Sequence, residues 1–248
     1  MARMLTENIM IYITGDTHRD FRRVEEFCER FETTKDDILV ILGDVGINYI
    51  AENIHKYPRH LSDNGLKKLL NELPITMFCI HGNHEIRPQN IAGYTETIWN
   101  GGAVFIEPEF PNLIFAKDGE IFNLNNNRCL VIGGAYSIDK EYRLLKDMGW
   151  WPDEQPSEEI KRRVEERLDD EKWQVDIVFS HTCPYKYIGQ IFSVIYKNID
   201  NSTEEWLDKI EDKLSFIRWY CGHMHVEKVI DKMRFMYNDF IELGAYHD

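Results

Sequence analysis

The sequence lacks the features that mark secreted and membrane-spanning proteins. Only five cysteines occur in 248 residues, their number is odd, and no two form a CxxC pair. A disulfide-stabilised secreted domain has an even, regularly spaced set, so we expect a reducing compartment, the cytoplasm. The apolar stretch Ile9–Ile13 is too short for a signal-peptide core and far too short to span a bilayer. We therefore predict a cytoplasmic location and no membrane partner.

Positive charge is also scarce. The chain has 29 Lys and Arg residues against 43 Asp and Glu residues, for a net charge of −14. Because long nucleic acids bind basic surfaces, this balance argues against them as partners and leaves a small phosphorylated substrate open. Hydrophobic residues make up 43% of the chain, and no repeat, low-complexity linker or charge block divides it. We predict one domain over residues 1–248, and the sequence gives no indication of its oligomeric state.

Short apolar runs alternate with amphipathic segments in the first third of the chain. This spacing is typical of buried parallel strands joined by helices. The predicted strands are Ile9–Thr14, Ile38–Leu42 and Ile75–Ile80, and the predicted helices are Asp20–Phe31 and Ser62–Leu73. Ser62 is a candidate N-cap for the second helix.

The rest of the chain changes character. Between Ala103 and Gly134, shorter apolar runs and turn residues predict hairpins or a meander. Further helices are predicted at Ser157–Glu171 and Thr203–Leu214, and further strands at Val175–Ser180, Phe216–Cys221, Val226–Ile230 and Arg234–Tyr237. The sequence therefore predicts an α/β protein with mixed rather than purely parallel sheets.

Five predicted strands end in a small cluster of Asp, His or Asn beside a small residue. The clusters are Gly15–His18, Gly43–Asp44, Gly82–Glu85, Ser180–His181 and Gly222–His225. Open α/β sheets place ligand-binding loops at the carboxyl ends of their strands, where Gly permits a sharp turn. A Gly-Asp pair by itself is usually a turn, and a buried His is more often a core residue than a ligand, so the argument depends on the five occurring together.

Together these clusters offer two Asp, one Asn and four His, without a thiolate. Oxygen and nitrogen donors of this kind suit two divalent ions such as Mn, Fe, Zn or Ni better than Ca or a structural zinc-thiolate site.

The ordered series GDxH, GD, GNHE, a single His and GHxH resembles the calcineurin-like metallophosphoesterase superfamily, over Gly15 to His225. The resemblance implies a four-layer α/β/β/α sandwich with a dinuclear metal centre at the strand ends. It assigns the first ion to Asp16, His18 and His225, the second to Asn83, His181 and His223, and makes Asp44 the bridge between them. It makes His84 the catalytic histidine beside the scissile phosphate.

The physical chemistry of such a centre supports the implied assignment. Two ions about 3.5–4 Å apart lower the pKa of a bridging water and neutralise phosphoryl oxygens, so the resulting hydroxide can attack phosphorus. His84 is then free to protonate the leaving-group oxygen or to stabilise the transition state. We therefore expect hydrolysis of phosphate mono- or diesters.

The sequence departs from the family pattern at two places, and these departures bear on the expected substrate and its phosphate contacts. Protein serine/threonine phosphatases of the superfamily carry an Asp-Arg pair soon after the bridging Asp, whereas here Asp44 is followed by Val-Gly-Ile-Asn. The missing pair argues against a dedicated protein phosphatase. The first motif also ends in Arg19 where the family usually has Gly.

Several residues near these motifs are candidate substrate contacts. Arg87 follows the GNHE turn and could supply the missing phosphate clamp, and Arg19 could also hold phosphate, although a surface position is an alternative for Arg19. Tyr136, Lys140 and Arg143 belong to a stretch after a predicted strand that could form one wall of the pocket, or equally a structural loop.

The sequence leaves two other functions open. One is a nuclease or nucleotide phosphodiesterase acting on short substrates, which the superfamily also includes. The other is a binding scaffold that has lost catalysis, although all seven ligand positions and His84 are present.

Overall fold

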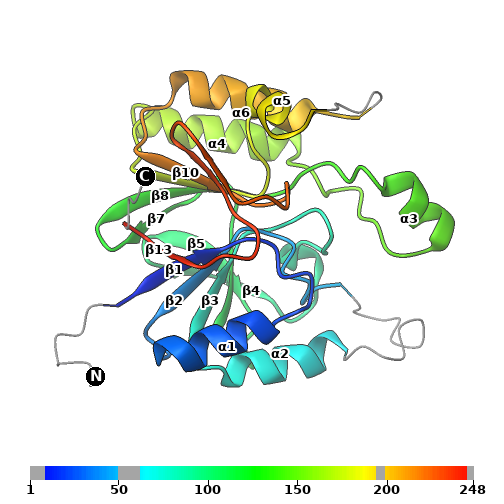
Figure 1. Cartoon of the computed structure of the whole chain (residues 1–248), viewed down its shortest axis with the longest axis vertical. Helices are drawn as coiled ribbons and strands as arrows, with labels where there is room; N and C mark the ends of the chain where they lie inside the picture. The colour runs from blue at the N-terminus through cyan, green and yellow to red at the C-terminus, as the bar shows by residue number, and fades with distance from the viewer. Residues whose placement is uncertain (1–8, 50–61, 194–198, 245–248) are drawn as a thin grey trace.

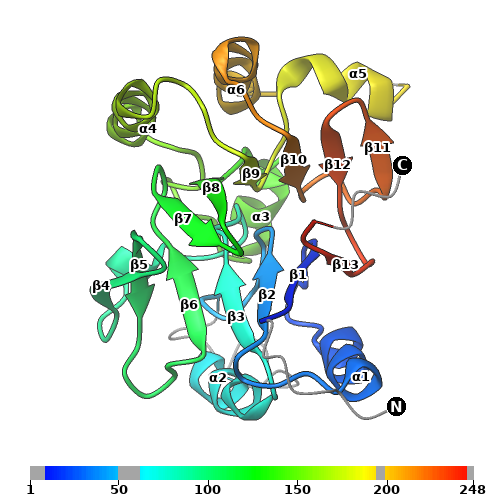
Figure 2. The ribbon, with the colours of Figure 1, turned by 90° about the vertical axis from the view of Figure 1, so that its left-hand side faces the viewer.

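The computed structural model describes residues 9–49, 62–193 and 199–244. These residues form two β-sheets packed face to face, with helices on both outer faces (Figures 1 and 2). The predicted four-layer α/β/β/α sandwich is confirmed.

The first sheet has seven strands. In spatial order they are β13 (Ile241–Glu242), β1 (Ile11–Thr14), β2 (Ile38–Ile41), β3 (Thr76–Cys79), β6 (Leu113–Ala116), β5 (Gly102–Ile106) and β4 (Thr95–Trp99). The four strands from β1 to β6 are parallel, and the flanking strands pair antiparallel. The carboxyl ends of β1, β2 and β3 therefore lie side by side at one edge of the sheet.

The second sheet has six strands. Their order is β11 (Lys228–Ile230), β12 (Met233–Phe235), β10 (Arg218–Cys221), β9 (Ile177–Ser180), β8 (Asn127–Ile132) and β7 (Ile121–Leu124). The four central strands are parallel, so β9 and β10 also end next to each other.

Helices cover the outer face of each sheet (Figure 2). The first sheet carries α1 (Arg22–Phe31) and α2 (Asp63–Glu72), and the second carries α4 (Glu158–Asp170), α5 (Ile188–Ile191) and α6 (Ser202–Lys213). Ser62 caps α2 by accepting the Gly65 N–H at 3.1 Å, as predicted, and Ser157 caps α4 in the same way. Short 3₁₀ turns occur at Pro88–Asn90 and Tyr185–Tyr187, and α3 (Lys140–Lys146) stands out beyond the two sheets (Figure 1).

Three apolar layers hold these elements together. Phe78, Phe122 and Phe179 belong to the layer between the two sheets. A second layer joins the first sheet to α1 and α2, and a third joins the second sheet to α4 and α6. Because strands in the middle of each sheet are buried on both faces, they read as continuous apolar runs in the sequence.

Four of these helices and strands were not expected from the sequence, and one of them, α5, has only four residues. The strand β4 has four exposed residues out of five, so its sequence shows no buried face. The helix α3 has no buried residue, and β13 is only two residues long. Each of these lacks the hydrophobic periodicity on which the predictions depend. None of the helices in the described part of the chain combines the length and apolar character needed to cross a membrane.

Candidate metal centre

The polar clusters at the five strand ends meet where the two sheets face each other. From the second sheet, the backbone N–H of His223 donates to Oδ1 of Asp16 at 3.0 Å. His181 Nδ1 lies 2.8 Å from the carbonyl oxygen of Leu42, which follows β2. The sheets are therefore joined by hydrogen bonds at the same place where the predicted ligands gather.

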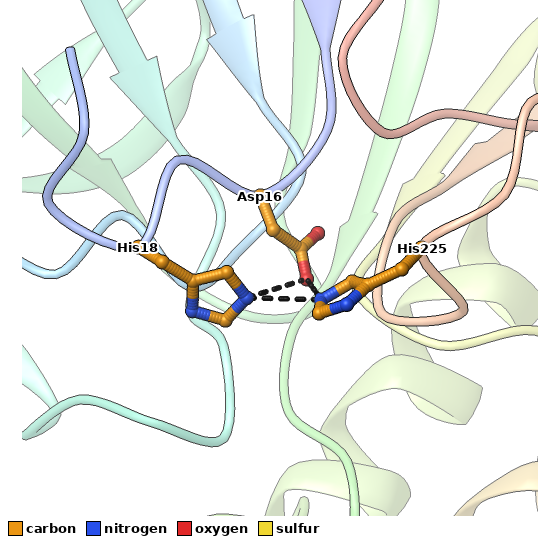
Figure 3. Close-up of side chains that lie close together, drawn as sticks. All are labelled: Asp16, His18 and His225. Atoms are coloured by element: carbon orange, nitrogen blue, oxygen red, sulfur yellow. Dashed lines mark hydrogen bonds and ion pairs between the residues drawn. The ribbon is translucent and has the colours of Figure 1, made fainter.

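Asp16, His18 and His225 form the first group of donor atoms (Figure 3). Oδ2 of Asp16 lies 3.1 Å from His225 Nε2 and 3.7 Å from His18 Nε2. The two imidazole nitrogens are 2.9 Å apart. Figure 3 shows all three polar ends pointing toward one spot, although His18 and His225 come from opposite ends of the chain.

A second group surrounds His181. Its Nε2 lies 2.8 Å from Oδ1 of Asn83 and 3.6 Å from Oδ1 of Asp44. The carbonyl oxygen of Leu42 only accepts, so Nδ1 of His181 can donate to it. A neutral His181 in that tautomer turns its Nε2 lone pair toward Asn83 Oδ1, and the two acceptor atoms could then share a cation. Asp16, Asp44 and His181 also bring ligand atoms within 4.8 Å of one another, so Asp16 belongs to both groups.

His223 completes the set of seven predicted ligands. Its ring centroid lies 4.9 Å from that of His181. Burial, together with the neighbouring His181, lowers the pKa of His223 to about 3, so its imidazole is neutral at physiological pH. A neutral imidazole is the form that binds a metal ion.

The electrostatics of Asp16 also suit a cation. Burial by itself would raise the pKa of this carboxyl group, but the hydrogen bond with His225 and the nearby His181 and His18 hold it below its usual value. Two buried carboxylates, four imidazoles and an amide oxygen thus converge on one place. This donor set fits divalent ions with oxygen and nitrogen ligands.

The backbone at the site is strained. Four of the seven predicted ligands adopt left-handed conformations, with φ of +45° at His18, +46° at Asp44, +60° at His223 and +50° at His225. Such a conformation costs a non-glycine residue roughly 1–2 kcal/mol. Strain of this kind concentrates where side chains must be aimed at a common point.

Glu85 holds two of the ligand loops together, a role that the sequence did not suggest. Its carboxylate accepts N–H groups from Gly82 at 3.0 Å and from Gly46 at 3.1 Å. Burial and the neighbouring Asp44 charge raise the pKa of Glu85 to about 7. The sequence hint to this role is that Glu85 is the last residue of the GNHE motif.

Ser137 and Glu154 orient Asn83, and they too were missed. The Asn83 amide nitrogen donates to Ser137 Oγ at 2.8 Å, and that hydroxyl donates to Glu154 Oε2 at 2.5 Å. The amide oxygen of Asn83 is thereby turned toward His181. No local sequence pattern connects residue 154 with residue 83, so only the folded chain reveals this contact.

His84 lies at the rim of the centre. Its Nε2 is 4.0 Å from Oδ2 of Asp44 and 4.0 Å from Oδ1 of Asp139, the residue that begins α3. Asp139 also pairs with Arg143 one turn later, at 2.8 Å. Burial lowers the pKa of His84, while the Asp44 charge opposes this effect. Asp139 and Arg143 therefore form an Asp-Arg pair beside His84. This pair comes from the N-cap and body of α3, whereas the pair of the protein phosphatases follows the bridging Asp.

The predicted substrate contacts fall into two groups. Tyr136 lines a cavity of about 570 Å³ that also borders Asp44 and His84, and Arg143 stands near His84. Lys140 is the first residue of α3, and its ammonium group lies 4.1 Å from the centre of the Trp150 ring. This is a cation–π contact between two residues of the same stretch of chain.

Two arginines require correction. Arg87 is buried in an ion pair with Asp118 at 2.5 Å and donates to the Asp153 carbonyl, so its guanidinium group is committed to the core rather than to a phosphate clamp. Arg19 pairs with Asp63 at 2.6 Å and donates to the carbonyl of Gly46. It ties the first motif to α2 and to the second motif.

A family model gives the decisive comparison. The model for calcineurin-like phosphoesterases matches residues 9–227, which include every predicted ligand. The chain belongs to the calcineurin-like phosphoesterase family. This membership confirms the resemblance inferred from the ordered motifs.

Solved structures share the fold of this calcineurin-like phosphoesterase at low sequence identity. The crystal structure of TT1561 of Thermus thermophilus is 14% identical, with a TM-score of 0.51, and the match covers 92% of this chain and 88% of that one. Another crystal structure is 13% identical, with a TM-score of 0.52, over 94% of this chain and 95% of that one. No curated protein sequence matches the chain.

Gly82 makes the close approach of two ligand loops possible. A Cβ atom at this position would lie 2.1 Å from both the backbone nitrogen and Oδ1 of Asp44. We expect Gly82→Ala to displace Asp44 and to weaken divalent-metal binding by at least about tenfold, in line with the cost of perturbing a ligand's support. Titration calorimetry with Mn²⁺ or Zn²⁺ measures the effect.

Gly101→Ala is the matched control. Gly101 has a φ of +90°, so alanine there is strained, but no atom lies within 4 Å of the added Cβ. This variant should lose stability and keep its metal affinity. Unchanged metal affinity in Gly82→Ala would contradict the structural role given to Gly82.

Proposed function

We propose that the protein is a metal-dependent hydrolase of phosphate mono- or diesters, with two divalent ions held by Asp16, His18, Asp44, Asn83, His181, His223 and His225. The observation that carries the proposal is the convergence of these seven donors from five strand ends into one site. When bound, the two ions would activate a water molecule and neutralise phosphoryl oxygens. Mn, Fe, Zn and Ni are all compatible with the donor set.

The chain's own residues supply the rest of the chemistry. Asp44 lies 3.6 Å from His181 Nε2 and shares a cluster of donor atoms with His181 and Asp16, which belongs to both groups, so it would bridge them. His84 stands 4.0 Å from this carboxylate, on the cavity side, where it would donate a proton to the leaving-group oxygen. Backbone hydrogen bonding fixes its position, because its N–H donates to Asp44 at 2.8 Å.

Asp139 and Arg143 would take over the work of the Asp-Arg pair that is missing after Asp44. Asp139 lies 4.0 Å from His84 and can orient its ring, while Arg143 places a positive charge close enough to influence the pKa of His84. A guanidinium group in this position would bind phosphoryl oxygens.

We further propose a cytoplasmic location and a small phosphorylated substrate. All five cysteines are free and buried, as suits a reducing compartment. A nuclease or nucleotide phosphodiesterase of short substrates, and a non-catalytic scaffold, are the competing functions. A panel of phosphomonoesters, phosphodiesters, nucleotides and a phosphopeptide, assayed with Mn, Fe, Zn and Ni, separates them.

Removing a bridging or ligating group should abolish turnover. We expect Asp44→Asn and His223→Ala each to lower kcat toward an aryl phosphate by at least about a thousandfold, because the charge that holds the ions or a ligand itself is lost. Metal content and kcat are measured together. Asp212→Asn, an exposed carboxylate on α6, is the control and should leave both unchanged. Full activity with full metal content in Asp44→Asn would refute the assignment.

Removing His84 should separate catalysis from metal binding. We expect His84→Ala to retain both ions and to lose about 10²- to 10⁴-fold in kcat, the usual contribution of a general acid. The loss should be smaller for substrates whose leaving group needs no proton, such as 4-nitrophenyl phosphate. An equal loss for good and poor leaving groups would argue against proton donation.

Arg143 should act on phosphate binding. We expect Arg143→Gln to raise the inhibition constant for inorganic phosphate by about 10- to 100-fold, because a charge-assisted hydrogen bond is worth about 1.5–3 kcal/mol. Arg162→Gln is a matched control, since Arg162 also pairs with an acid one helical turn away but projects into solvent from α4. Equal inhibition constants for phosphate in the two variants would show that Arg143 does not bind phosphate.

A further inference from the structure

The cavity beside the metal centre is lined by both polar and apolar residues. The polar residues at the metal centre, here called the polar side, are Asp44, Asn83, His84, His223 and His225, and the other polar residues that line the cavity are Asp139, Ser193, Asn201 and Glu204. The apolar residues that line the same cavity, here called the apolar wall, are Tyr136, Ile138, Ile188, Phe192, Ile199 and Met224. At about 570 Å³ the cavity has room for a phosphate group and a ring-sized substituent.

The apolar wall leaves large hydrophobic side chains in water. Ile138 is 68% exposed and Phe192 is 39% exposed. Single exposed hydrophobic residues are ordinary, but here they border one cavity next to a catalytic centre. Covering them with an apolar ligand would remove this surface from water and stabilise the complex.

The charges of the residues that line the cavity also favour an apolar ligand. Among the described residues that line it there is no Lys or Arg, so none of these residues offers a partner for a second anionic group. Asp139 is already paired with Arg143. Glu204 is buried, accepts the Thr182 hydroxyl at 2.8 Å, and has its pKa raised to about 7 by burial, so it carries only part of a negative charge at neutral pH.

We propose that the apolar wall binds the leaving group, and that the substrate is an ester between phosphate and a neutral, apolar alcohol or phenol. The inference rests on the proposed hydrolase function and adds its substrate class. Water adds to phosphorus, the ester P–O bond breaks, and the leaving-group oxygen gains a proton, so the apolar group departs as a free alcohol or phenol. The substrate therefore carries its charge at one end, against the polar side of the cavity.

A matched substrate pair tests this assignment. The substrates 4-propylphenyl phosphate and 4-(2-carboxyethyl)phenyl phosphate have similar size and similar phenol acidity, but only the second has a charge at its far end. We expect kcat/KM to favour the propyl compound by at least about tenfold, because the apolar wall gains free energy by burying the terminal methyl group, whereas it would have to desolvate the carboxylate without a partner. Each compound is assayed as the monoester and as its methyl diester.

Variants of the apolar wall connect the preference to the structure. We expect Phe192→Ala and Ile188→Ala each to reduce the preference to less than about threefold. Ile98→Ala is the control, because Ile98 is 71% exposed on the edge strand β4 and does not line the cavity. It should keep the full preference.

A binding experiment gives an answer that does not depend on turnover. The non-hydrolysable 4-propylbenzylphosphonate and 4-(2-carboxyethyl)benzylphosphonate are titrated into the metal-loaded protein by calorimetry. We expect the propyl compound to bind at least about tenfold more tightly. Equal affinities, tighter binding of the carboxylate or no binding of either would overturn the assignment of the apolar wall.

The two experiments separate the failure of this inference from that of the proposed function. Hydrolysis of both substrates without preference would overturn the substrate class and leave the hydrolase standing. Selective phosphonate binding without hydrolysis of any substrate under any metal would overturn the hydrolase and retain the specificity of the wall.

Discussion

The site depends on the way in which Asp16 joins the two sheets. This carboxylate leaves the end of β1 in the first sheet and accepts the backbone N–H of His223, which follows β10 in the second. Its other oxygen meets His225. Because the ligands come from both sheets, the donor set exists only when the sheets are packed with their carboxyl ends together. The apolar layer between the sheets is therefore also what positions the chemistry.

Packing and strain at the site are linked. The glycines that begin three of the ligand clusters, Gly43, Gly82 and Gly222, lie against another part of the site. A Cβ at Gly222, for example, would lie 2.3 Å from Oδ1 of Asp16. The ligands themselves take left-handed conformations at a cost in stability. Buried hydrogen bonds such as those of Glu85 offset this cost and keep the loops in place.

The two ends of the proposed substrate would meet different physical environments. On one side, carboxylates and imidazoles would hold cations that attract phosphate. On the other side, the apolar wall offers hydrophobic surface without Lys or Arg among its described residues. The net charge of −14 is thus compatible with a phosphorylated substrate, since bound ions, with Arg143 beside them, would supply the attraction.

The sequence by itself determined the class of fold, the ordered motifs and the set of donor residues, because buried strands and the clusters that end them have local patterns. It could not show that Asp139 and Arg143 lie beside His84, that Glu154 orients Asn83, or that Arg87 is buried against Asp118. Each of these contacts joins residues from separate elements, and α3 has no buried face to reveal it. Only the tertiary structure decided them, because side chains distant in the sequence become neighbours through the packing of the two sheets.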